Sequence, residues 1–183
     1  ALRRALQQRN GCLLAFLALI PLRRRALTGL RLGQSFLRTD GGFWVEIPAE
    51  LSKNATQWST QVPDCLIPVL NRYLEDTRLW LLARSDMSTD LLWITKDGKP
   101  LTDTALSTLI RHQTRSLFGI ELSPHLFRDM AATTLARHSP ADARLIRPLL
   151  AHASHQTAER HYNHAKGIEV GRSLAEVIRE RRG

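Results

Sequence analysis

The spacing of apolar residues predicts a mainly helical protein. Residues 1–20 are good helix formers and stop at Pro21, which cannot continue a helix. Residues 12–20 are all apolar, so this helix is expected in the core. A second helix is predicted over residues 66–82, with a stripe of apolar side chains at helical spacing: Leu66, Val69, Leu70, Tyr73, Leu74, Leu79 and Leu82.

Short apolar runs between these two helices predict a small antiparallel sheet. The expected strands are residues 30–37, 43–47 and 57–62. Residues 40–42, Asp-Gly-Gly, provide glycines for a hairpin turn. Lys53 falls in the connection between the second and third strands.

The second half of the chain predicts a short extended piece and then further helices. Residues 91–95 are expected to be extended, with a turn over residues 96–100. Thr102 or Asp103 can cap one helix, and the best-marked helix start is Ser123-Pro124, where Ser123 is the expected cap and Pro124 occupies the first helical position. The predicted helices cover residues 23–30, 104–118, 124–137, 141–150, 156–165 and 170–181. The expected fold class is α+β, mainly helical, with the small sheet on one edge.

Composition adds a strong preference for polyanions. Across 183 residues the net charge is +9, from 26 Lys and Arg against 17 Asp and Glu, and the pI is about 10.7. Arginine dominates the basic set, and its planar guanidinium suits bidentate contacts with phosphate. Such a balance is typical of nucleic-acid-binding proteins, although ribosomal and membrane-surface proteins share it.

The cysteines and the apolar run exclude several other classes. Cys12 and Cys65 are too few for a disulfide framework, so we expect a buried thiol at Cys12 and a reducing, cytoplasmic compartment. Residues 12–20 are half of a membrane span. Pro21 and three arginines follow where a signal peptide would have its cleavage site. We therefore expect no membrane association.

Several polar residues have the chemistry that metal-free phosphodiester cleavage needs. Such a site requires a nucleophile, cations for the phosphate oxygens, an acid for the leaving alkoxide and a base. An unperturbed tyrosine, with a pKa near ~10, needs a cationic setting or proton removal to attack. The candidates, each individually compatible with a surface or packing role, are Arg23, Lys53, His125, Arg128, His152 and Tyr162.

In this order and spacing the residues resemble the catalytic domain of the tyrosine recombinase, or phage integrase, family. The matching pieces are Leu22-Arg23 with Leu27, Leu30 and Arg31, then Ser52-Lys53, His125-Leu-Phe-Arg128, Leu150-Ala-His152 and Tyr162-Asn-His. The resemblance covers essentially all of residues 1–183, without the N-terminal core-binding domain that such enzymes carry.

The resemblance implies a mechanism and partners. Tyr162 would attack double-stranded DNA to give a 3′-phosphotyrosyl link. Arg23, Arg128 and His152 would stabilise the phosphorus centre, Lys53 would protonate the leaving 5′-oxygen, and His125 would assist proton transfer. It implies no metal or other cofactor. It also implies a homo-tetramer on DNA, with a monomer in isolation, encoded by a phage or mobile element or associated with the bacterial nucleoid.

The sequence departs from the family pattern at several positions. Ala26 stands where the family often has an acidic residue, and Ala151 replaces a common glycine. His161, beside Tyr162, competes with His152 as the catalytic imidazole. Residues 170–181 would dock on a neighbouring protomer or simply complete the core.

Other functions stay open at the level of sequence. His152, His155, His161 and His164 form two H-x-x-H pairs that could bind zinc, although zinc sites without cysteine or carboxylate are uncommon. A two-metal nuclease is disfavoured because no acidic cluster accompanies the basic motifs. A non-catalytic DNA-binding relative and a type-IB topoisomerase share the same basic residues.

Overall fold

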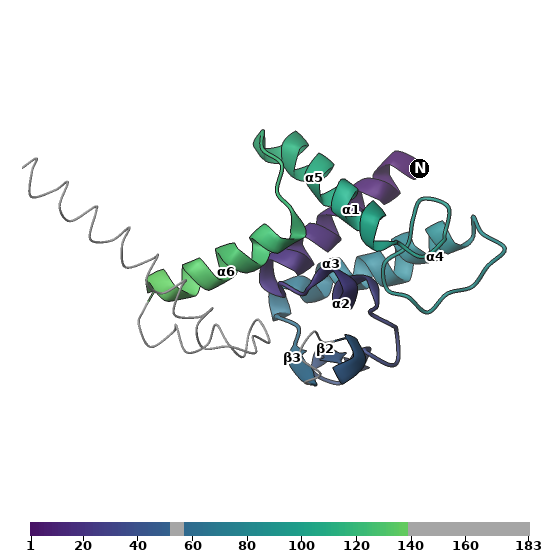
Figure 1. The fold of residues 1–183 in the computed structure, drawn as a ribbon. Helices are drawn as coiled ribbons and strands as arrows, with labels where there is room; N and C mark the ends of the chain where they lie inside the picture. The colour runs from purple at the N-terminus through teal and green to yellow at the C-terminus, as the bar shows by residue number, and fades with distance from the viewer. Residues whose placement is uncertain (52–56, 139–183) are drawn as a thin grey trace, which may run out of the picture. The chain divides into compact units, whose positions relative to one another are not determined.

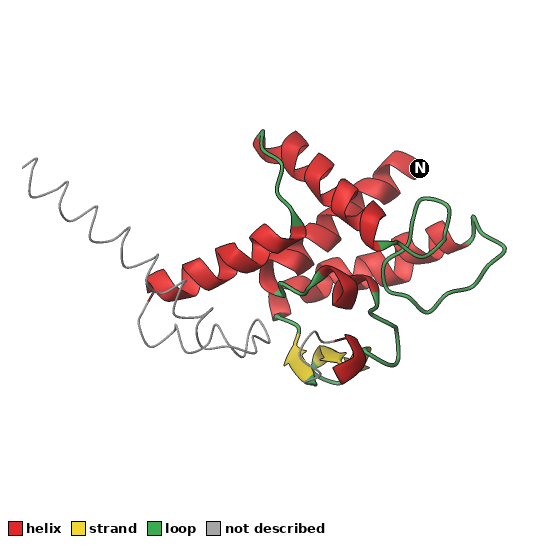
Figure 2. Cartoon of the chain, in the orientation of Figure 1, coloured by secondary structure: helices red, strands yellow, loops and turns green. Residues whose placement is uncertain are grey.

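The computed structural model describes residues 1–51 and 57–138, and its chain divides into two compact units, residues 1–127 and 128–183 (Figures 1 and 2). The first unit holds the helices α1 (Leu2–Leu19), α2 (Arg24–Thr28), α3 (Ile67–Arg72), α4 (Arg78–Leu82) and α5 (Asp103–Phe118). The unit boundary falls inside α6 (Pro124–His138). No helix in the described residues is both long and apolar enough to cross a membrane.

Helix α1 forms the centre of the first unit. Leu13, Phe16 and Leu17 on it are completely buried. The Phe16 ring meets Trp93 edge-on, with the ring centroids 5.6 Å apart. Cys12 is also buried, and its burial raises the pKa of the thiol to about 12. The predicted core helix over residues 1–20 and the buried thiol are both confirmed.

Three antiparallel strands follow α2: β1 (Phe36–Thr39), β2 (Gly42–Ile47) and β3 (Trp58–Gln61), in the order β1-β2-β3. Thr39 pairs with Gly42 across a two-residue turn, and Gly42 has a φ of 116°, which glycine adopts without strain. Alternate residues of β2 are buried, as expected for a strand with one face on the core. The hairpin and the small sheet are confirmed.

The predicted strand over residues 30–37 is wrong as a continuous element. Arg31 and Leu32 make only isolated bridges, and the first strand begins at Phe36. The backbone turns sharply at Gly33, where φ is 74°. The Ser35 hydroxyl accepts a hydrogen bond from the Arg31 amide at 2.8 Å, which closes this turn. The Ser35 and Phe36 amides both donate to the Arg31 carbonyl, at 3.0 and 2.8 Å, so local backbone bonds together with this side-chain bond replace a strand ladder.

The predicted helix over residues 66–82 is helical throughout but not uniform. Two 3-10 turns, η1 (Ala49–Leu51) and η2 (Asp64–Leu66), lie in the linkers beside β3, and a π-helical turn, η3 (Tyr73–Thr77), joins α3 to α4. A π-turn holds more residues than an α-turn, so it changes which residues face the core downstream. Leu79, expected on the buried stripe, is 56% exposed, whereas Leu81 is buried. Val69 is also more exposed than predicted, at 40%.

Residues 91–95, predicted to be extended, belong to no named strand: Leu91 and Ile94 make isolated bridges, with a bend at Leu92 between them. Their amides pair in part with neighbouring backbone: the Leu92 amide donates to the Leu30 carbonyl at 2.8 Å. Several of their carbonyls are instead satisfied by buried side chains. The Arg78 guanidinium donates to the Thr89 and Leu91 carbonyls at 2.6 and 2.7 Å.

Two further side chains complete this arrangement. The Tyr73 hydroxyl donates to the Leu92 carbonyl at 2.8 Å, and the Arg9 guanidinium donates to the Ile94 carbonyl at 2.8 Å. Arg9 and Arg78 are both buried, and desolvation lowers the pKa of each guanidinium. Buried cations of this kind are stable only when fully hydrogen-bonded. These two arginines therefore hold the extended segment in place.

The cap predicted for α5 and the start predicted for α6 are confirmed. The Thr102 hydroxyl accepts from the Ala105 amide at 3.3 Å and caps α5, which ends at Gly119 in the left-handed conformation. Helix α6 begins at Pro124, the position where a missing amide hydrogen costs nothing.

Candidate phosphate-binding site

Arg23 lies at the junction between the core helix α1 and the short helix α2. Leu22 before it is buried, and Arg23 itself has an extended backbone, with φ −64° and ψ 147°, as the N-terminal cap of α2. Its carbonyl accepts the first helical hydrogen bond, from the Leu27 amide at 2.9 Å. The side chain therefore leaves the backbone at the start of this five-residue helix.

The Arg23 guanidinium is half-buried, and desolvation lowers its pKa from the usual value of 12.5. Within the described part of the chain, its side chain takes part in no hydrogen bond or ion pair. A guanidinium remains charged near neutral pH and offers five N–H donors in a planar fork. A partly desolvated cation with open donors is a natural binding group for a phosphate or sulfate anion.

The neighbouring arginines differ from Arg23. Arg24 and Arg25 are exposed, so of the three consecutive arginines Arg23 is the most buried. Ala26, on the other face of α2, is buried in the apolar core. At this position, where the family often has an acidic residue, the Ala26 side chain packs in the core and carries no charge.

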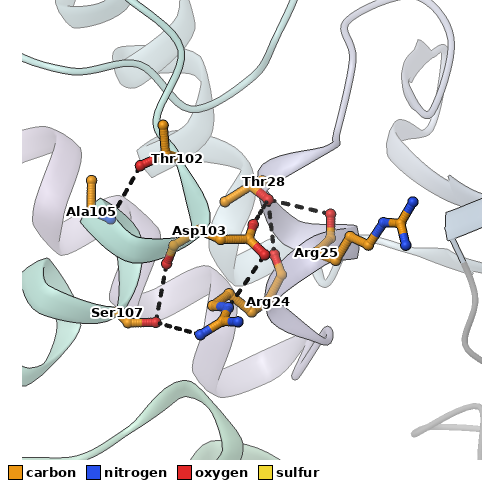
Figure 3. A network of polar contacts seen from close by, with 7 residues as sticks. All are labelled: Arg24, Arg25, Thr28, Thr102, Asp103, Ala105 and Ser107. Carbon is orange, nitrogen blue, oxygen red and sulfur yellow. Dashed lines mark hydrogen bonds and ion pairs between the residues drawn. The ribbon is translucent and has the colours of Figure 1, made fainter.

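A polar network joins α2 to the start of α5 (Figure 3). The Asp103 carboxylate accepts from the Arg24 guanidinium at 3.3 Å and from the Thr28 hydroxyl. Arg24 also donates to the Ser107 hydroxyl at 3.4 Å. The sequence indicated Asp103 only as an alternative helix cap. Its contact with α2 depends on tertiary structure and was missed.

Two candidate residues lie on α6. His125 is exposed, whereas Arg128, one turn later, is only 5% exposed. His125 belongs to the first unit and Arg128 to the second. A guanidinium buried to this degree requires hydrogen-bonding partners.

The remaining candidates, Lys53, His152 and Tyr162, lie outside the described residues, as do the predicted helices over residues 141–150, 156–165 and 170–181. The connection that contains Lys53 is bounded by the end of β2 at Ile47 and the start of β3 at Trp58, as the sequence predicted. The assignment of all six residues to one site stays a prediction.

Comparison with known proteins defines the class. The profile of the phage integrase family matches residues 1–167, and the chain belongs to this family. The chain is 32% identical over 96 residues to the tyrosine recombinase XerC of Anoxybacillus flavithermus. This match covers 52% of the chain and 31% of the relative. It is 28% identical over 156 residues to XerC of Pseudomonas syringae pv. syringae, covering 84% and 48% of the two proteins.

Solved structures share the fold. The XerH site-specific recombinase, crystallised in a post-cleavage complex with its palindromic difH substrate, matches 94% of this chain and 47% of its own, with a TM-score of 0.70 and 22% identity. The match to the XerA recombinase covers 100% of this chain and 62% of the XerA chain, with a TM-score of 0.69 and 20% identity. The present chain thus spans less than two thirds of these relatives.

Proposed function

We propose that this protein is a site-specific DNA recombinase that cleaves and rejoins DNA strands through a 3′-phosphotyrosyl intermediate, in the integration or excision of a phage or mobile element. The half-buried guanidinium of Arg23, which has no hydrogen-bond or ion-pair partner among the described residues, is the observation that carries the proposal. Membership of the phage integrase family and a net charge of +9 support it.

In the proposed reaction, the Tyr162 oxygen attacks the scissile phosphorus and the bond from phosphorus to the 5′-oxygen breaks. Lys53 supplies the proton that the leaving 5′-oxygen needs, and His125 assists the removal of the tyrosine proton. Arg23 and Arg128 bind the non-bridging oxygens, and His152 donates a further hydrogen bond. The new phosphodiester retains the energy of the old one, so a 5′-hydroxyl can reverse the step on another strand.

The proposed reaction uses no metal ion, because arginines neutralise the charge that metals neutralise in two-metal nucleases. The proposed partner is double-stranded DNA, bound mainly through its phosphates, and the active assembly is a homo-tetramer on two sites. Phosphate-dominated binding weakens steeply with salt. The affinity for duplex DNA should therefore fall by orders of magnitude between low and physiological salt.

A covalent trapping experiment tests the proposal without knowledge of the target sequence. The chain is incubated with a pool of nicked duplexes of random sequence, in which the short strand beyond the cleavage point diffuses away and prevents religation. Denaturing electrophoresis then separates covalent protein–DNA adducts. We expect an adduct with the wild type, in the presence of EDTA, and none with Tyr162→Phe, which should still bind the pool.

The alternatives give different results in this experiment and in a plasmid-relaxation assay run beside it. DNA binding without an adduct from any sequence would identify a non-catalytic relative. Relaxation of a supercoiled plasmid without sequence preference would identify a topoisomerase. An adduct that persists in Tyr162→Phe would reject Tyr162 as the nucleophile, and an adduct abolished by EDTA would reject the metal-free mechanism.

A further inference from the structure

Helix α2, which begins directly after Arg23, is too short to be stable without contacts to the rest of the protein. Helix α2 has five residues, and helices of this length are not stable alone in water. Its apolar side is fixed by the buried Ala26 and Leu27. Apolar packing is not directional, so it limits the rotation of a single helical turn only weakly. The polar side of α2 must supply the remaining constraint.

Asp103 supplies a directional contact on this polar side. Its two carboxylate oxygens are engaged separately: one accepts from the Arg24 guanidinium at 3.3 Å and the other from the Thr28 hydroxyl. Arg24 and Thr28 are the first and last residues of α2 (Figure 3). A carboxylate that holds both ends of a single turn fixes its rotation and its position along the axis.

The carboxylate is itself held at a fixed place. Asp103 is the first residue of α5, directly after the capping Thr102, and the helix dipole favours a negative charge there. The Ser107 hydroxyl donates to the Asp103 carbonyl at 3.1 Å and lies 3.4 Å from the Arg24 guanidinium. The first turn of the 16-residue helix α5 therefore serves as the support for α2.

We propose that Asp103 is a positioning residue, which orients the Arg23 guanidinium toward the reacting phosphate by holding both ends of α2. This inference rests on the proposed function. Asp103 does not touch the phosphate; it acts through α2, whose first backbone hydrogen bond starts at the Arg23 carbonyl. The resulting effect concerns orientation more than stability, because ion pairs as exposed as this one contribute little to folding.

The matched control is the ion pair between Arg31 and Asp90. The side chains of Asp90 and Asp103 are both 39% exposed. Their arginine partners are 47% exposed for Arg31 and 53% exposed for Arg24. Asp90→Asn removes an equivalent surface charge pair in the same unit but touches no residue of α2. Two variants of Thr28 provide a further control: Thr28→Val removes the hydroxyl that donates to Asp103, and Thr28→Ser keeps it.

The test measures the rate of covalent adduct formation at saturating protein. We expect Asp103→Asn and Thr28→Val to slow it by about 10- to 100-fold, because a shift of about 1 Å in a positioned group has effects of this order. Thr28→Ser and Asp90→Asn should retain the wild-type rate. Thermal midpoints of all four variants should stay within about 4 °C of the wild type.

A double-mutant cycle separates this inference from the proposed function. Duplex affinity at low salt is measured for the wild type, Arg23→Met, Asp103→Asn and the double variant. We expect the Asp103→Asn effect to disappear once Arg23 is absent. If the wild type forms no adduct but this coupling is found, the recombinase proposal fails and the orienting role stands. If Asp103→Asn forms the adduct at the wild-type rate and the cycle shows additive effects, the orienting role is wrong.

Discussion

Two groups of arginines in the first unit differ in what their guanidinium groups contact. Arg9 and Arg78 are buried, and each donates to backbone carbonyls of the extended residues 89–94. Arg23 is half-buried and, among the described residues, has no such partner. The first group completes the hydrogen bonds of a segment that belongs to no sheet. Arg23 makes no such bond to the part of the chain that the structure describes, so its donors face no described acceptor, as in a ligand-binding residue.

This difference teaches that burial alone does not distinguish a structural arginine from a functional one. Desolvation lowers the pKa of all three guanidinium groups. What differs is the presence of acceptors within the protein. An arginine whose acceptors are carbonyls of its own fold stabilises that fold, whereas one without acceptors is available to an external anion.

The largest expected effect is that of Arg78→Met on stability. Methionine preserves much of the apolar stem but leaves the carbonyls of Thr89 and Leu91 without their donor. Buried acceptors left unpaired cost about 1–3 kcal/mol each, so we expect a loss of about 2–5 kcal/mol in the free energy of unfolding. Urea titration followed by circular dichroism measures it. An unchanged midpoint would show that Arg78 is not structural.

Arg23→Met should have little effect on stability and a large effect on adduct formation, in contrast to Arg78→Met. Arg23→Met removes no protein hydrogen bond among the described residues, so the unfolding free energy should change by less than about 1 kcal/mol. The rate of adduct formation should fall by about 10²–10³-fold, as for the loss of one donor to a transition-state oxyanion. A stability loss as large as that of Arg78→Met, with cleavage intact, would contradict the comparison.

Alkaline pH should lower the free energy of unfolding by an intermediate amount, through ionisable groups in the buried core. Burial raises the pKa of Cys12 from 9.0 to about 12, and burial also raises the pKa of Tyr73. The folded state therefore keeps protons that the unfolded chain releases above about pH 9, so stability falls as pH rises from 9 toward 12. By pH 10.5 we expect a loss of about 1–2 kcal/mol.

A cysteine pair provides the control for this pH dependence. Cys12→Ala should reduce the decrease in urea midpoint between pH 8 and 10.5, whereas Cys65→Ala, at an exposed thiol, should leave it unchanged. Equal pH dependence in the two variants would mean that the Cys12 thiol does not contribute.

The smallest effect is expected for a surface arginine. Arg38 donates to Glu75 and Asn71, both at 2.7 Å, but its side chain is 60% exposed. Arg38→Met should cost less than about 1 kcal/mol in unfolding free energy and leave adduct formation unchanged. A loss as large as that of Arg78→Met would show that hydrogen-bond geometry outweighs burial in this protein.

Much of the described fold could be predicted from local sequence signals. The core helix before Pro21, the hairpin at Gly42, the cap at Thr102 and the helix start at Pro124 each depend on residues close together in the chain. The failures have nonlocal or subtle causes. The turn at Gly33, closed by local backbone bonds and the Ser35 hydroxyl, replaced part of a strand, and the π-helical turn beginning at Tyr73 changed the buried face of a helix.

The candidate site was predictable in part for the same reason. The order of the motifs predicts Arg23 as a phosphate ligand, which stays a prediction, and the family assignment is confirmed. The contact of Asp103 with α2 joins residues 75 positions apart, and no periodicity indicates it. The structural roles of Arg9 and Arg78 were likewise not predictable, because they depend on which carbonyls tertiary packing leaves unpaired.

The most direct test of the central claim, that the Arg23 guanidinium is reserved for phosphate, is a crystal structure of the chain with a short duplex and Tyr162→Phe to prevent cleavage. The account predicts that Arg23 donates to non-bridging oxygens of one backbone phosphate, while Arg9 and Arg78 keep their carbonyl partners. A structure in which Arg23 pairs with a protein carboxylate, and the DNA phosphates lie elsewhere, would contradict it.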